Sequence, residues 1–164
     1  MTASPPSASG IPALIQRLNL QNRVLFTGMT VWNAWEDKDI VDVYNMMDVF
    51  MLLTTGEGFG IPFIEAMSAE VPVVATDYTT TDELLLENGV CGEAVKLVLE
   101  MTGGYTVDRG IADVDDAAGR LEKLYIDKGL RELYGKVGRK KVVELYNWDV
   151  VMPEWKRVFD KLLE

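Results

Sequence analysis

The stretch Thr54–Met67, TTGEGFGIPFIEAM, has residue types and a spacing that suit the binding of an anion. Its first half contains Gly56, Gly58 and Gly60. Glycine allows a backbone to approach a ligand closely, and Pro62 suits the first turn of a helix. The N–H groups of Gly58 through Ile61 then lie at a helix N-terminus, where unpaired donors and the helix dipole favour a phosphate group. The turn therefore predicts a site for a diphosphate.

Two carboxylates stand in the same stretch, Glu57 in the turn and Glu65 on the first turns of the helix. A loop that binds only phosphate would prefer no acid, whereas the hydroxyl groups of a sugar or a ribose donate readily to a carboxylate. A nucleotide sugar combines both chemical parts. The alternative interpretation is that Glu57 is a solvated turn residue and that Glu65 only favours the helix dipole. Neither GxGxxG nor GxxxxGK[ST] occurs, so the dinucleotide and P-loop interpretations have no support.

Apolar runs and helical spacing predict the elements that position this turn. The predicted strands are 23–28, 49–55, 71–76 and, more weakly, 92–98, and the predicted helices between them are 12–18, 39–47 and 61–69. This order predicts an α/β, Rossmann-like three-layer domain, with a parallel sheet of about four strands joined by right-handed crossovers. In open sheets of this kind ligands bind beyond the carboxyl ends of the strands. The glycine-rich turn lies at such an end.

The last third of the chain is predicted to be helical, with stretches beginning near Asp113, Leu130 and Val151. The acids Asp113, Asp115 and Asp116 are interpreted as an N-cap and first turn rather than a DxD metal motif. Pro153 implies that the last helix is either kinked or begins after Asp149. Residues 100–110 are expected to form a flexible insertion because of their Gly103-Gly104 pair.

The composition excludes several function classes. The formal net charge of −10 argues against binding of a nucleic-acid backbone. The absence of histidine removes His-based catalytic pairs and His-ligated zinc, and no metal or other cofactor is expected. The single cysteine, Cys91, predicts a buried thiol in a reducing, cytoplasmic setting. No apolar run suits a membrane span. Residues 1–11 are expected to be a disordered leader and residues 12–164 a single nucleotide-sugar-binding domain.

The run EGFGIPFIEAM followed by VPVVATD resembles the Glu-x7-Glu donor motif of the retaining, GT-B-fold glycosyltransferases of family 4, the glycosyl transferases group 1. The similarity extends from RVLFTG through IVDVYNMMDVFMLLT to YNWDVVMPEWKRVFDKLL. It implies a C-terminal donor-binding domain that transfers a glycosyl group from a nucleoside-diphosphate sugar without a metal.

Carried over by position, the resemblance implies a role for each residue of the motif. The transferred sugar's hydroxyl groups contact Glu57, the catalytic residue, and the ribose contacts Glu65. The diphosphate and sugar contact the backbone of Gly58, Phe59, Gly60 and Ile61. The nucleotide base lies near Gly28 and Met29.

The sequence also departs from the family pattern. Family domains usually begin with two further strands and helices that carry an Arg and a Lys for the diphosphate, and nothing before Pro12 supplies these. The family's small residue before the VPVV strand is here Glu70. Catalysis needs donors arranged around the developing charge, so the isolated chain is expected to be inactive without an acceptor-binding domain. Two alternatives stay open: a non-catalytic scaffold that keeps the fold, and one half of a split glycosyltransferase.

Several surface features have more than one interpretation. The strand at 23–28 must pair, either with the strand at 49–55 or across a homodimer. Trp32 and Trp35 are expected to pack locally. The basic cluster Lys136, Arg139, Lys140 and Lys141 is interpreted as a solvated face. Trp155 and Phe159 on the last helix belong either to the core or to an interface.

Overall fold

The computed structural model describes residues 10–26 and 36–163, and it divides at Glu36 into two compact units. The first unit contains α1 (Ile11–Arg17), which confirms the helix predicted at 12–18. The strand predicted at 23–28 is wrong over its described part, because residues 24–26 form no strand. A strand needs a partner for its backbone groups, and the described ladders include none for this segment, where the Leu25 side chain is 94% exposed. Residues 27 and 28, Met29, Trp32 and Trp35 lie outside the described residues.

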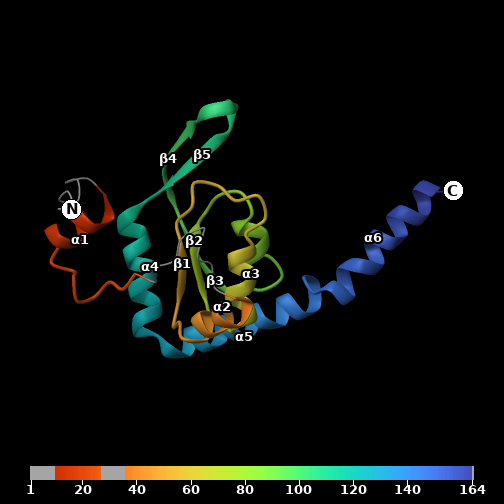
Figure 1. The fold of residues 1–164 in the computed structure, drawn as a ribbon, viewed down its shortest axis with the longest axis horizontal. Coiled ribbons are helices and arrows are strands. Elements are labelled where there is room, and N and C mark those ends of the chain that lie inside the picture. Colours follow the sequence, from red (N-terminus) through yellow and green to blue (C-terminus); the bar gives the residue numbers. More distant parts are fainter. Residues whose placement is uncertain (1–9, 27–35, 164) are drawn as a thin grey trace, which may run out of the picture. The chain divides into compact units, whose positions relative to one another are not determined.

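The second unit is built on a parallel sheet of three described strands in the order β1-β2-β3. These are β1 (Phe50–Leu52), β2 (Val73–Thr76) and β3 (Gly92–Val95) (Figure 1). All three were predicted, although the sheet has one described strand fewer than expected. The proposed pairing of residues 23–28 with β1 is absent among the described residues, where β1 pairs with β2 alone.

Two apolar clusters show that the sheet is covered on both faces. Val73 and Ala75 pack with Phe63 and Met67 of α3 (Ile61–Ser68), on one face. Val74, between them in the chain, packs on the other face with Ala117 and Leu124 of α4 (Val114–Ile126). Figure 1 shows α3 and α4 on opposite sides of the strands. The predicted three-layer arrangement is therefore confirmed, and the side chains of β2 alternate between the two cores.

Helices complete the second unit. α2 (Asp37–Asn45) precedes β1, a short π-helix η1 (Asp82–Leu86) follows β2, and α5 (Lys128–Leu145) and α6 (Trp148–Leu163) end the chain. The Asp113 carboxylate accepts hydrogen bonds from the N–H groups of Asp115 and Asp116 at 2.9 and 3.0 Å, which confirms the predicted N-cap of α4. No helix among the described residues is long and apolar enough to cross a membrane.

The segment predicted to be a flexible insertion is instead an antiparallel hairpin. β4 (Leu97–Thr102) pairs with β5 (Asp108–Ala112), and a single 3₁₀ turn, η2 (Gly104–Thr106), joins them. In Figure 1 the hairpin projects away from the parallel sheet. The Gly103-Gly104 pair begins the turn of a paired ribbon, so here two adjacent glycines indicate a hairpin turn and not an irregular segment.

Two further expectations about the C-terminal helices need correction. α6 begins at Trp148, before Pro153, so the later start is wrong. Trp155 and Phe159 stack on each other at 5.8 Å but remain 52% and 54% exposed, so they are not part of a core among the described residues. The solvated-face interpretation of the basic cluster is wrong for Lys141, which is 3% exposed and donates to the Leu84 carbonyl at 2.9 Å.

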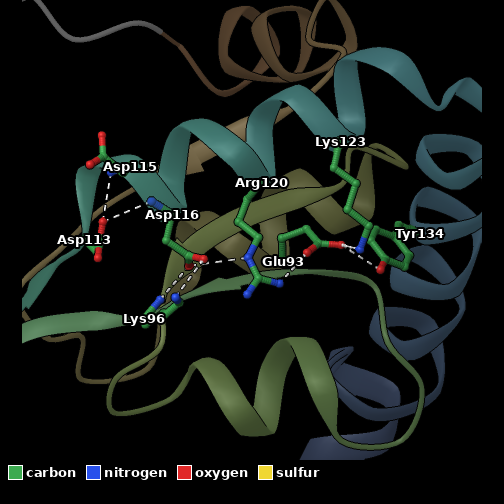
Figure 2. Close-up of polar contacts among 8 residues, drawn as sticks. All are labelled: Glu93, Lys96, Asp113, Asp115, Asp116, Arg120, Lys123 and Tyr134. Carbon is green, nitrogen blue, oxygen red and sulfur yellow. Dashed lines mark hydrogen bonds and ion pairs between the residues drawn. The ribbon is translucent and has the colours of Figure 1, made fainter.

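A buried carboxylate fastens α4 and α5 to the sheet. Glu93 of β3 is 3% exposed and accepts bonds from Arg120 at 2.9 Å, Lys123 at 2.5 Å and the Tyr134 hydroxyl at 2.9 Å (Figure 2). Burial raises the pKa of Glu93, but the three donors outweigh burial and hold that pKa below its ordinary value. Because its partners are satisfied, we interpret this cluster as a structural contact between helices and sheet.

Candidate functional site

The glycine turn connects the carboxyl end of β1 to the N-terminus of α3. Gly60, the N-cap, has φ 91° and ψ 44°, in the left-handed region. A Cβ atom at Gly60 would lie 2.7 Å from the Phe63 ring, so both conformation and space require glycine here. The helix begins at Ile61 with Pro62 in its first turn, as the sequence predicts.

The first amides of this turn are available to a ligand. Among the described residues the N–H groups of Gly58, Phe59, Gly60 and Ile61 donate no hydrogen bond. Gly58, Phe59 and Ile61 are exposed, whereas Gly60 is buried. Unpaired N–H groups at the positive end of a helix dipole are suited to an anionic group.

The turn is fastened to the loop that follows β2. The N–H group of Glu57 donates to the Thr79 hydroxyl at 3.0 Å, and the Thr76 hydroxyl donates to the Thr54 carbonyl at 2.8 Å. The Thr80 hydroxyl oxygen in this loop is buried and has no hydrogen-bond partner among the described residues. The carboxyl ends of β1 and β2 therefore meet at one edge, as parallel topology requires.

Strand β5 of the hairpin is the third part of this edge. The N–H group of Gly110 donates to the Thr55 carbonyl at 3.0 Å, and Arg109 Nη1 donates to the Thr55 hydroxyl at 3.1 Å. Sequence reasoning missed Arg109, because the contact joins positions 54 residues apart and no local motif announces it.

Acidic groups also stand at this edge. The pKa of Asp77, directly after β2, is raised first by desolvation and then by the neighbouring Asp82 carboxylate, and the Arg120 guanidinium partly offsets this. Glu57 is half-buried in the turn. An anionic ligand would therefore need a positive group here besides the neutral amides.

The structure gives the two predicted acidic residues different surroundings. Glu65 is exposed on α3, and its Oε2 accepts a hydrogen bond from the Tyr44 hydroxyl of α2 at 2.9 Å. The Tyr44 ring in turn packs against Phe50, with ring centroids 5.7 Å apart. Burial first and the Glu65 carboxylate second raise the pKa of Tyr44 above its ordinary value. No hydrogen bond or ion pair joins Glu57 to Glu65 in the described part of the chain.

An open groove of about 750 Å³ lies beside Glu65, between α2, α3 and α5. Tyr44, Ser68 and Arg139 also line it, whereas the residues of the glycine turn do not. Arg139 donates to the Ser68 carbonyl at 2.5 Å and joins α5 to the end of α3. Sequence reasoning missed Tyr44, which reads as one more apolar residue on the inner face of a helix. Among the described residues no group of three or more acidic or cysteine side chains suits a metal ion.

Comparisons with known proteins show the family of the chain. A family model described as glycosyl transferases group 1 matches residues 6–141. The glycosyltransferase CapM of capsular polysaccharide biosynthesis in Staphylococcus aureus is 32% identical over 126 residues, which cover 77% of this chain and 29% of CapM.

Two solved structures share the fold. Sucrose-phosphate synthase from Thermosynechococcus elongatus superposes with a TM-score of 0.73 at 24% identity, covering 93% of this chain and 33% of that one. Anabaena HepE, in complex with UDP and glucose, superposes with a TM-score of 0.70 at 21% identity, covering 92% and 35%. The chain thus spans about a third of the length of these relatives. It belongs to the glycosyl transferases group 1 family and has part of the GT-B fold.

Proposed function

We propose that this chain is the donor-binding part of a retaining glycosyltransferase and that it binds a nucleoside-diphosphate sugar. The observation that carries the proposal is the set of four N–H groups at the start of α3 that have no partner in the described part of the chain, in a chain of this family. The relative HepE was solved with UDP and glucose, which supports a ligand of this class.

We assign each part of the proposed ligand a chemical counterpart in the glycine turn or on α3. The diphosphate accepts hydrogen bonds from the amides of Gly58 to Ile61. The transferred sugar's hydroxyl groups donate to Glu57, and the ribose hydroxyls donate to Glu65. During transfer, negative charge grows on the departing diphosphate, and fixed amides with the helix dipole stabilise that charge without reorganising. An acceptor-binding domain or chain would complete the cleft.

Calorimetry tests the proposal with uridine, guanosine and adenosine diphosphates and their sugars. We expect saturable binding of one nucleotide, weakened about 10-fold or more by Glu65→Ala, because a hydrogen bond to a charged group contributes roughly 1.5–3 kcal/mol. Glu122→Ala, which removes an exposed acid from α4, is the matched control and should bind as the parent does. If none of the six ligands saturates, the proposal is wrong.

The Tyr44 hydroxyl is expected to hold Glu65 in position for a ribose. Tyr44→Phe keeps the ring contact with Phe50 but removes the bond to Oε2. We expect it to weaken the ribonucleotide about 3- to 10-fold, the effect of one hydrogen bond, and to leave the 2′-deoxynucleotide almost unchanged. Parallel titrations of the two nucleotides give the selectivity ratio. An equal loss for both would contradict a role at the ribose.

A further inference from the structure

We propose that Arg109, which pairs with Met101 near the turn of the β4–β5 hairpin, binds the diphosphate of the donor at the glycine turn. This inference rests on the proposed function and adds a residue to the site from outside the Glu-x7-Glu motif. It begins with position: Arg109 Nη1 donates to the Thr55 hydroxyl at 3.1 Å, and Thr55 directly precedes the glycine turn. The guanidinium is therefore held next to the segment whose amides are unpaired.

Strand β5 is fastened to the glycine turn next to Arg109. The main chain of Gly110 bonds to the Thr55 carbonyl at 3.0 Å. Gly110 is buried, and a Cβ atom there would lie 2.8 Å from Leu97 and 2.9 Å from the Tyr78 ring. This close packing holds the backbone from which Arg109 extends, and the bond to Thr55 directs its guanidinium toward the turn.

The charge of Arg109 is also uncommitted. Among the described residues no carboxylate lies within ion-pair distance of its guanidinium, whereas Arg120 and Lys123 are paired with Glu93. The side chain is exposed, and Thr55 accepts a bond from only one of its two terminal nitrogens. A guanidinium has five N–H donors in a planar fork that suits two phosphate oxygens.

A positive group at this place meets an electrostatic need. The amides of the turn are neutral donors, and Glu57 and Asp77 bring negative charge to the same edge. A diphosphate would experience their repulsion unless a cation offset it. Among the described residues, Arg109 is the cationic residue that donates a hydrogen bond to the segment between β1 and α3.

The test compares ligands that differ only in phosphate. Titrations use the full chain with the nucleoside diphosphate that the parent protein binds, the matching monophosphate and the bare nucleoside. Arg109→Gln should weaken the diphosphate at least 10-fold, weaken the monophosphate less and leave the nucleoside unchanged. Arg109→Lys keeps the positive charge but not the planar fork of donors, so its affinity for the diphosphate should lie between those of the parent and Arg109→Gln. Arg157→Ala, an exposed arginine on α6, should match the parent.

The outcomes separate this inference from the proposed function. If the parent binds a diphosphate and Arg109→Gln binds it equally well, the inference fails and the proposed function stands. If Arg109→Gln weakens the nucleoside as much as the diphosphate, Arg109 acts through structure and the inference fails again. If the parent binds no nucleotide, both fail. Thermal melting followed by circular dichroism shows whether each variant is folded, and Arg109→Lys decides the case if Arg109→Gln does not fold.

Discussion

Replacing Glu93 by alanine is expected to lower the free energy of unfolding by about 3 kcal/mol, the lower end of the cost of breaking a buried ion pair. The carboxylate is 3% exposed and accepts from Arg120, Lys123 and Tyr134. Its removal leaves the buried Tyr134 hydroxyl without this acceptor and Lys123 without its counter-charge, and leaves Arg120 with Asp116 alone. The loss stays near the lower end because Arg120 and Lys123 are 35% and 49% exposed and keep part of their hydration. Urea unfolding at pH 7 measures it.

An exposed pair provides the control. Lys128 and Glu132 form an ion pair within α5 with side chains that are 78% and 56% exposed. Glu132→Ala should change stability by less than about 0.5 kcal/mol, because water screens such pairs. If Glu93→Ala costs no more than Glu132→Ala, the buried cluster does not fasten α4 and α5 to the sheet.

The same cluster should make stability depend on pH in a defined direction. The pKa of Glu93 in the folded protein lies below its ordinary value of 4.5. The unfolded chain therefore binds the proton more readily, so the contribution of the carboxylate is complete above about pH 4.5 and is lost as the pH falls through the folded pKa. Glu93→Gln cannot titrate, so the stability difference between it and the parent should shrink in that acidic range. A constant difference from pH 7 to pH 3 would contradict this assignment.

The elements that the sequence predicted are those with a local signature. The strands and helices between Asp37 and Val95 follow from continuous apolar runs and helical spacing, because their apolar side chains pack into the two cores. The N-cap at Asp113 follows from acids three residues apart. The strand at 23–28 failed on its described residues because an apolar run specifies a strand only where a neighbour pairs with it.

The residues of the candidate site also differ in whether a local sequence pattern predicts them. Its turn, from Gly56 to Ile61, could be read from glycines before a helix start. Tyr44 and Arg109 could not, because each reaches the site through a contact between distant positions. The burial of Lys141 could not be predicted either, because a lysine in a basic cluster usually indicates a solvated face. Only the structure shows that its ammonium group donates to the Leu84 carbonyl.

Replacing Gly135 by alanine is expected to destabilise the protein by about 2 kcal/mol, within the range for overpacking a well-packed contact. A Cβ atom at Gly135 on α5 would lie 2.1 Å from the Glu70 carbonyl oxygen, which is backbone and cannot rotate away. Glu70 itself has φ 60°, in the left-handed region. This conformation is unfavourable for any residue that has a Cβ atom. Because Glu70 already holds this unfavourable conformation, the segment between α3 and β2 has little room to adjust.

Gly119→Ala separates this steric effect from helix propensity. Gly119 lies inside α4, and nothing stands within 4 Å of a Cβ atom there. Alanine at Gly119 should stabilise the protein by up to about 1 kcal/mol, its advantage over glycine in a helix. The same advantage applies at Gly135, so only the contact with Glu70 can make the two substitutions act in opposite directions. Thermal unfolding of both variants gives the signs, and a gain in stability at Gly135 would show that α5 does not lie against the end of α3 as closely as described.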